Sequence, residues 1–137
     1  MIPVISFVGR SNSGKTTYLI KLISELKKRG YKVAVIKHHH GDFNIDHPGK
    51  DTWRHAEAGA DVVMISSPNK MAMIQKNQQE LSLEDLICHI SNVDLIITEG
   101  YKREEIPKIE VLRSAVSKDL VCAERDLIAI VTDVQMA

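Results

Sequence analysis

The sequence has few of the features that mark specialised classes of protein, and each shortage excludes one class. Its two cysteines, Cys88 and Cys122, lie far apart and form no C-x-x-C pair, so neither a disulfide framework nor a zinc knuckle is expected. No apolar run approaches the roughly 20 residues that span a bilayer, and the first residues lack the basic-then-apolar order of a signal peptide. We therefore expect a cytoplasmic protein that does not enter a membrane.

An excess of one charge is also missing. Lysine plus arginine count 18, and aspartate plus glutamate also count 18, so the formal net charge is zero. This balance excludes a general attraction to nucleic acid, and any anion site must be local. The chain does have 44% hydrophobic residues among its 137. That is enough to bury the core of one domain, which we expect to span residues 1–137.

Short apolar runs alternate with amphipathic segments along the chain. The expected strands, rich in β-branched residues, are 3–8, 31–37, 61–66, 71–74, 94–98, 108–112 and 127–132. The expected helices, with apolar residues at helical spacing, are 18–29, 51–58 and 82–90. The single helix after the first strand implies that the second strand is its parallel neighbour. The pattern predicts an α/β fold, a three-layer sandwich with a mainly parallel sheet.

A phosphate-binding motif follows the first strand. Residues 9–16, GRSNSGKT, match G-x-x-x-x-G-K-[ST], the P-loop of nucleotide-binding proteins. The glycines let backbone N–H groups point at phosphate oxygens, and the following helix adds its positive N-terminal end. Lys15 is expected to reach the β- and γ-phosphates, and Thr16 to bind Mg²⁺. The predicted nucleotide-binding residues are Gly9, Arg10, Ser11, Asn12, Ser13, Gly14, Lys15, Thr16 and Thr17.

A carboxylate at the end of a neighbouring strand normally completes such a site. Glu99 follows the apolar run Leu95–Thr98 and precedes Gly100, so it should emerge at the carboxyl edge of the sheet beside the phosphates. We predict Glu99 as a magnesium ligand and, with Lys15, as a catalytic residue. A surface acid at a strand end is the alternative interpretation.

A polar loop rich in histidine follows the second strand. Residues 38–50, HHHGDFNIDHPGK, are too long for a simple connection and should have no regular structure. Imidazoles and carboxylates in this loop suit Zn²⁺ or Ni²⁺, although their spacing fits no standard metal motif. The loop could instead surround the nucleotide or an anionic partner molecule, or be a plain surface loop. All three interpretations remain open from these residues.

Four segments of the chain resemble the MobB proteins of molybdenum cofactor maturation, and the similarity covers almost all of it. The segments are GRSNSGKT, KHHHGDFNIDHPGKDTWRHAEAGAD, DLIITEGYK and PKIEVLR. Many unrelated NTPases share the P-loop, but the K-H-x-H loop followed by D-x-x-G-K-D-[ST] is specific to this family. The resemblance implies a P-loop NTPase fold and a GTP-binding adapter. It would work beside the partner nucleotidyltransferase that forms molybdopterin guanine dinucleotide.

The resemblance also assigns roles to residues. It implies a homodimer that binds Mg·GTP and hydrolyses it weakly, so activity as an enzyme would be secondary to nucleotide binding. Asp46 would join Thr16 and Glu99 around the metal. His38, His40, Lys50 and Asp51 would form a loop for substrate or partner.

Two features depart from the pattern of the family and of P-loop GTPases. This chain stops at Ala137, where family members usually continue. Thr132 and Asp133 lie where P-loop GTPases often read guanine, but the lysine of the N/T-K-x-D motif is absent, so the preference for guanine depends on resemblance alone. Two other functions remain open: a GTPase that delivers a metal held by the histidine loop, and a small-molecule kinase.

Overall fold

The computed structural model describes residues 1–135 of the 137. The contacts divide the chain into two compact units, one comprising residues up to His40 together with those from Ile90 onward, and the other Gly41–His89. The single domain predicted over 1–137 stays a prediction, and the chain end at Ala137 falls outside the described residues.

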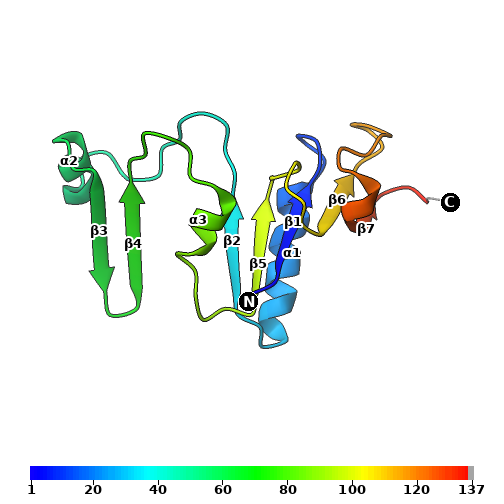
Figure 1. Cartoon of the computed structure of the whole chain (residues 1–137), viewed down its shortest axis with the longest axis horizontal. Helices are drawn as coiled ribbons and strands as arrows, with labels where there is room; N and C mark the ends of the chain where they lie inside the picture. The colour runs from blue at the N-terminus through cyan, green and yellow to red at the C-terminus, as the bar shows by residue number, and fades with distance from the viewer. Residues whose placement is uncertain (136–137) are drawn as a thin grey trace. The chain divides into compact units, whose positions relative to one another are not determined.

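A five-stranded sheet forms the centre of the first unit. Its order is β2-β5-β1-β6-β7, and every neighbouring pair is parallel (Figure 1). The strands are β1 (Val4–Val8), β2 (Val33–Lys37), β5 (Leu95–Glu99), β6 (Lys108–Leu112) and β7 (Leu127–Thr132). This arrangement confirms the predicted α/β class with a mainly parallel sheet, as in P-loop NTPase-like folds.

The predicted pairing of the first two strands is wrong. β5 lies between β1 and β2, with Val4 opposite Ile96 and Val33 opposite Leu95. A crossover helix fixes the handedness of the connection but not how many strand positions it passes over. The position between β1 and β2 is filled by a strand about sixty residues later in the chain, which no local pattern could reveal.

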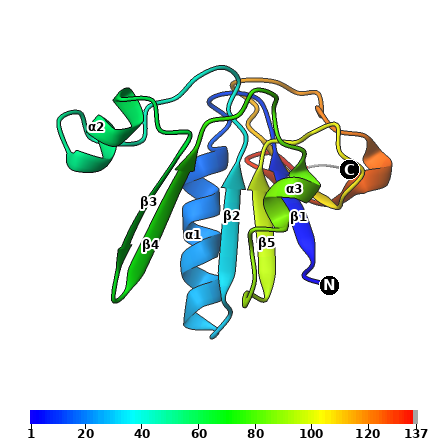
Figure 2. The same cartoon turned by 60° about the vertical axis from the view of Figure 1, so that its left-hand side comes forward.

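Helix α1 (Lys15–Lys28) lies against one face of this sheet (Figure 2). Leu19 on the helix is buried with Phe7, Ile97 and Val111 from three strands, and these side chains form the core of the unit. The helix begins three residues before the predicted start at residue 18, because it begins inside the glycine motif itself. The positive N-terminal end of α1 therefore faces the loop that precedes the helix.

The second unit contains two short helices and a hairpin. They are α2 (Asp51–Glu57), β3 (Val62–Ser67), β4 (Lys70–Gln75) and α3 (Leu83–Ile87). β3 and β4 pair antiparallel, as predicted from the turn signal between them. α3 begins at a capping box of Ser82 and Asp85 and is shorter than the predicted 82–90. Across the described residues, none of the helices has the length and apolar character needed to cross a bilayer.

Candidate functional site

The glycine motif forms a tight loop between β1 and α1. Gly14 has a φ of 88° and Asn12 a φ of 64°, so the chain turns through the left-handed region twice before the helix begins. No side chain caps the N-terminus of α1, and its first turn has no acidic residue. The free N–H groups and the positive helix end are therefore available to an anion.

Lys15 lies over this loop. Its Nζ donates to the Gly9 carbonyl oxygen at 3.2 Å, and the side chain is half-buried. The ammonium group is thus held at the mouth of the loop, where a bound polyphosphate would meet it. The sequence predicted both this lysine and its position after Gly14. Its binding and catalytic roles stay predictions.

Glu99 meets the start of α1. Its Oε1 accepts a hydrogen bond of 2.5 Å from the Thr16 hydroxyl, and the residue is only 8% exposed. The sheet register explains this contact, because Glu99 ends β5 directly opposite Phe7 of β1. β5, which carries the carboxylate, is therefore next to β1, which leads into the loop, as the sequence led us to expect.

Thr16 and Glu99 together fit a small, hard cation. Mg²⁺ prefers oxygen ligands and commonly takes one or two from the protein, with water and phosphate completing its shell. A hydroxyl and a carboxylate oxygen held side by side at the end of the loop match that demand. Asp46, the third predicted ligand, lies in the second unit, where its Oδ1 accepts from the His47 N–H at 2.8 Å. Its part in a metal site stays a prediction.

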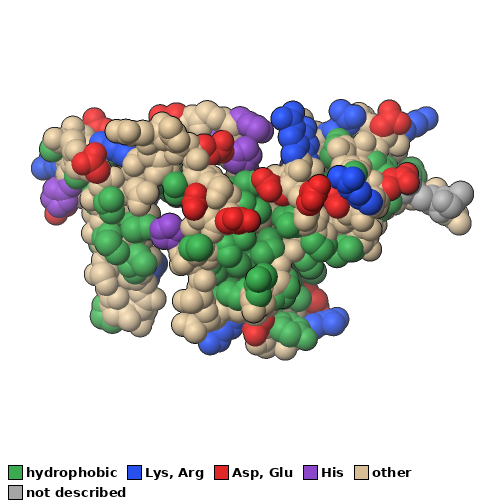
Figure 3. Space-filling view, in the orientation of Figure 1, with side chains coloured by type: hydrophobic (Ala, Val, Ile, Leu, Met, Phe, Trp, Pro, Cys, Tyr) green, Lys and Arg blue, Asp and Glu red, His purple; other side chains and the backbone are tan. Residues whose placement is uncertain are grey.

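Three rings pack together where β2 and β5 end. The ring centroids of His38 and His40 are 4.7 Å apart, and those of His38 and Tyr101 are 4.9 Å apart. Figure 3 shows histidine side chains grouped at the surface in this region. A Cβ on Gly100 would lie 3.2 Å from His38 Cβ, and Tyr101 itself has a φ of 59°. The tight turn after Glu99 thus brings Tyr101, which the sequence did not single out, against the predicted His38.

The other predicted loop residues belong to the second unit. Lys50 precedes α2 and accepts from the Arg54 N–H through its carbonyl at 2.9 Å, while Asp51 is the first residue of that helix. As predicted, residues 38–50 contain no helix or strand. Within residues 1–135, no three His, Cys, Asp or Glu side chains are grouped so as to hold a metal ion. The metal and partner roles of this loop stay predictions.

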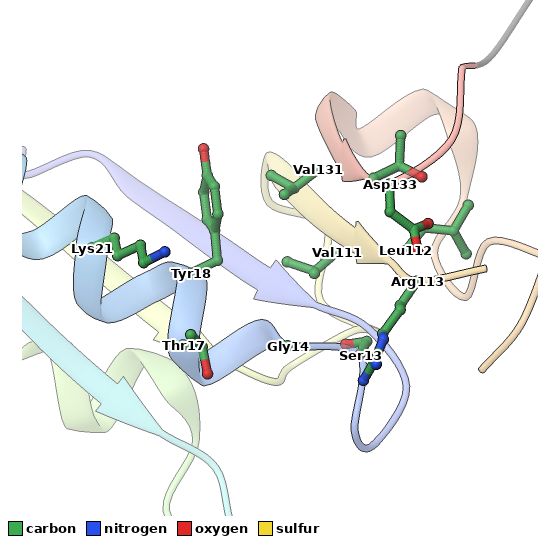
Figure 4. Close-up of a pocket in the computed structure, with 11 residues that line it drawn as sticks. Ser13, Gly14, Thr17, Tyr18, Lys21, Val111, Leu112, Arg113, Val131 and Asp133 are labelled. Atoms are coloured by element: carbon green, nitrogen blue, oxygen red, sulfur yellow. The ribbon is translucent and has the colours of Figure 1, made fainter. Parts of the chain in front are cut away.

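A pocket opens beside the loop, between α1 and the ends of β6 and β7 (Figure 4). Its lining comes from the first unit only: Ser13, Gly14, Thr17, Tyr18, Lys21, Val111, Leu112, Arg113, Val131, Thr132 and Asp133. The sequence drew attention to Thr132 and Asp133 but missed Arg113, which follows β6 as Asp133 follows β7. The position of Arg113 in the sequence could have identified it, because Arg113, like Asp133, comes directly after the carboxyl end of a strand.

Asp133 is the one carboxylate in the lining of this pocket. The backbone N–H of Ser114 donates to its Oδ1 at 2.9 Å, and the Ser114 hydroxyl donates to its Oδ2 at 3.0 Å. The backbone N–H first, and the hydroxyl second, hold the pKa of Asp133 below its usual value. The pocket therefore presents an ionised, acceptor-only group at neutral pH.

Comparison with known proteins gives one consistent family. The model of the MobB family, described as molybdopterin guanine dinucleotide synthesis protein B, matches residues 4–133. A Haemophilus influenzae protein named molybdopterin-guanine dinucleotide biosynthesis adapter protein is 38% identical over 134 residues, or 96% of this chain and 75% of that protein. The Escherichia coli K12 protein of the same name is 38% identical over 143 residues, or 99% of this chain and 81% of its own length.

Solved structures agree with the sequence relatives. The crystal structure of Bacillus subtilis MobB superposes with a TM-score of 0.78 at 26% identity, covering 98% of this chain and 82% of that one. A crystal structure of molybdopterin-guanine biosynthesis protein B gives a TM-score of 0.72 at 32% identity, covering 96% and 84%. The similarity therefore covers nearly all of this chain and more than four-fifths of each of these two structures.

Proposed function

This chain belongs to the MobB family, and from that premise we propose that it is a cytoplasmic GTP-binding adapter in the biosynthesis of molybdopterin guanine dinucleotide. The names of its relatives support the pathway. The observation that carries nucleotide binding is the contact of Thr16 with Glu99 at the N-terminus of an uncapped helix. A magnesium-bound polyphosphate requires a hydroxyl, a carboxylate and several free N–H groups close together.

Each residue of the loop has a defined part in this proposal. The N–H groups from Gly9 to Thr17 surround the phosphate oxygens, and Lys15 turns from the Gly9 carbonyl to the β- and γ-phosphates. Thr16 and Glu99 would hold Mg²⁺, which would supply positive charge to neutralise the phosphates. Hydrolysis by this set is weak, and the nucleotide state is what a partner nucleotidyltransferase would sense.

Titration of the protein with fluorescently labelled GTP, with and without Mg²⁺, tests nucleotide binding. In Lys15→Ala we expect affinity to fall by about 10- to 100-fold, because a charge-assisted hydrogen bond to phosphate is lost. Lys28→Ala is the matched control, since Lys28 is exposed in the last turn of the same helix. Glu99→Gln should bind GTP with reduced dependence on Mg²⁺. Unchanged affinity in folded Lys15→Ala would refute the assignment of the loop.

We also propose that the protein forms a homodimer. Four apolar residues on one face of the β3–β4 hairpin are exposed: Val62, Met64, Met71 and Met73. Both strands of this two-stranded sheet are edges, and such edges and apolar faces favour pairing with another chain. A second copy of this chain is the occupant that the family resemblance supports.

A further inference from the structure

Lys37 ends β2 beside the carboxylate of the proposed magnesium site. β2 and β5 lie side by side, and their register places Lys37 directly opposite Glu99, the last residue of β5 (Figure 2). Residues opposite one another in a parallel pair point to the same side of the sheet. That side is the one on which α1 lies, because the Glu99 carboxylate accepts from Thr16 at the start of the helix. Lys37 therefore stands at the loop end of the sheet, one strand beyond Glu99.

Hydrogen bonds fix the backbone around Lys37. The pairing of β2 with β5 continues past it, since the His38 N–H donates to the Glu99 carbonyl at 3.0 Å. On the other side of β5, the Gly100 N–H donates to the Phe7 carbonyl at 2.9 Å. The ends of β2, β5 and β1 are thus joined up to the residues that carry the site. The Cα of Lys37 is held in a set position relative to Glu99 and the phosphate loop.

The side chain of Lys37 is not engaged within the protein. Lys37 is exposed, and across residues 1–135 its ammonium group makes no hydrogen bond or ion pair. Glu99, its neighbour in the sheet, is bonded to Thr16 instead. The sheet is also open here, because Val35, on the same side of β2 as Lys37, is 44% exposed. The ammonium group can therefore meet a ligand without breaking an existing contact.

We propose that Lys37 binds the terminal phosphate of the nucleotide and so makes the site prefer a triphosphate to a diphosphate. The inference rests on the proposed function, because it assumes that the loop, Thr16 and Glu99 hold a magnesium-bound nucleotide. The metal in such sites bridges the β- and γ-phosphates, which places the γ-phosphate beside Glu99. Neighbouring strands are about 4.8 Å apart, and the four-carbon stem of a lysine can carry its charge across that spacing.

The two lysines of the site have different parts in this scheme. Lys15 belongs to the loop and meets both the β- and the γ-phosphate, so it serves diphosphates and triphosphates. Lys37 approaches from the other side of Glu99, where only a third phosphoryl group extends. A diphosphate leaves it in solvent. The contact with Lys37 therefore exists only in the triphosphate state of the protein.

Calorimetric titration with GDP and with the non-hydrolysable GTP analogue GppNHp, at one concentration of Mg²⁺, tests the inference. In Lys37→Ala, affinity for GppNHp should fall by about 10-fold, because a charge-assisted hydrogen bond to phosphate is lost, and affinity for GDP should not change. Lys37→Gln should behave like Lys37→Ala, and Lys37→Arg, which keeps the charge, should lose less. Because Lys37 is exposed, all three variants should unfold at the denaturant midpoint of the wild type.

Lys32→Ala is the matched control. Lys32 is also exposed and directly precedes β2, but it lies at the opposite end of the strand, where its backbone N–H donates to Asp94 at 2.7 Å. Its affinities for GDP and GppNHp should match those of the wild type. Lys15→Ala should give a third pattern, in which both nucleotides bind more weakly.

Two outcomes would overturn the inference and leave nucleotide binding in place. Equal affinity of the wild type and Lys37→Ala for GppNHp would show that Lys37 meets solvent only. An equal loss of affinity for GDP and GppNHp in Lys37→Ala would show that the lysine acts through Glu99 and not on the terminal phosphate. If the wild type binds neither nucleotide, the proposed function fails and this inference fails with it.

Discussion

At the scale of single residues, Gly9 shows how closely the phosphate loop packs against the sheet. A Cβ at this position would lie 2.7 Å from the Val111 carbonyl oxygen and 2.9 Å from Ser13 Oγ. Neither contact is tolerable, and the carbonyl belongs to backbone that cannot rotate away. Gly9→Ala must therefore move either the loop or the end of β6.

We expect Gly9→Ala to lower the free energy of unfolding by about 1–3 kcal/mol, as overpacking does, and to abolish GTP binding. Denaturant unfolding and nucleotide titration measure the two effects. Gly30→Ala is the control, because Gly30 has a φ of 88°, against 156° for Gly9, and nothing lies within 4 Å of its Cβ position. It should lose stability through backbone strain and keep its affinity for GTP. If both variants bind GTP normally, the packing argument is wrong.

Cys122 gives a second prediction at this scale. Burial first, and hydrogen bonding with Glu110 second, raise the pKa of its thiol to about 11. At pH 8 only about one thiol in a thousand is then ionised, against about one in ten for a thiol with a pKa of 9.0. Timed alkylation with iodoacetamide, followed by mass spectrometry, should label the exposed Cys88 long before Cys122. The two cysteines should be alkylated at similar rates only in urea, where the chain is unfolded. Similar rates in the native protein would contradict the prediction.

The same shift predicts the direction of a pH effect on stability. A pKa raised from 9.0 to about 11 means that the folded protein holds this proton more tightly than the unfolded chain. The stabilisation is fully present below pH 9 and is lost as the pH rises toward 11. Unfolding midpoints measured between pH 8 and 11 should therefore fall for the wild type and fall less for Cys122→Ala.

At the scale of elements, β6 departs most from a simple strand. Lys108 and Glu110 are almost fully buried although both carry charge. Lys108 Nζ donates to the Glu104 and Ile106 carbonyls and pairs with Asp126 at 3.4 Å. The Glu110 carboxylate accepts from the N–H groups of Val121 and Cys122. The two charges thus fix the loops on either side of the strand.

Glu110→Gln tests this role of β6. The amide group places N–H donors opposite the backbone N–H groups of Val121 and Cys122, so at least one donor is left buried without an acceptor. We expect the free energy of unfolding to fall by about 1–3 kcal/mol. Glu105→Gln is the control, because Glu105 is exposed and its 3.5 Å contact with Arg125 lies in solvent. A similar loss in both variants would show that the buried hydrogen bonds are not responsible.

Local sequence predicted most elements but not their partners. The strand at residues 108–112 was evident from its β-branched and apolar residues, while the burial of Lys108 and Glu110 was not, because their partners come from loops with no periodic pattern. The phosphate loop and Glu99 could be predicted, since motif and strand end are both local features. Tyr101 and Ser114 could not, because each acquires its place through a contact with a residue distant in sequence. The same reason explains the wrong pairing of β1 with β2.

At the scale of the whole molecule, the hairpin β3–β4 exposes large apolar side chains on both of its strands. The register places Val62 and Met64 on the same face as Met71 and Met73, with Met64 directly opposite Met73. A two-stranded sheet is marginal by itself, so an exposed face of this kind gains stability when another chain covers it. The proposed homodimer would bury this face, and its dissociation would expose it.

Met64→Glu should shift the protein from dimer to monomer, because burying an unpaired carboxylate in an apolar interface is strongly unfavourable. Size-exclusion chromatography with light scattering measures the mass directly, and dilution of the wild type gives the reference affinity.

Ile65→Glu is the matched control. Ile65 is 58% exposed against 59% for Met64, but the alternation of the strand places it on the opposite face. If Ile65→Glu dissociates the dimer and Met64→Glu does not, the opposite face of the hairpin is the interface. A wild type that stays monomeric at high concentration would refute the homodimer itself.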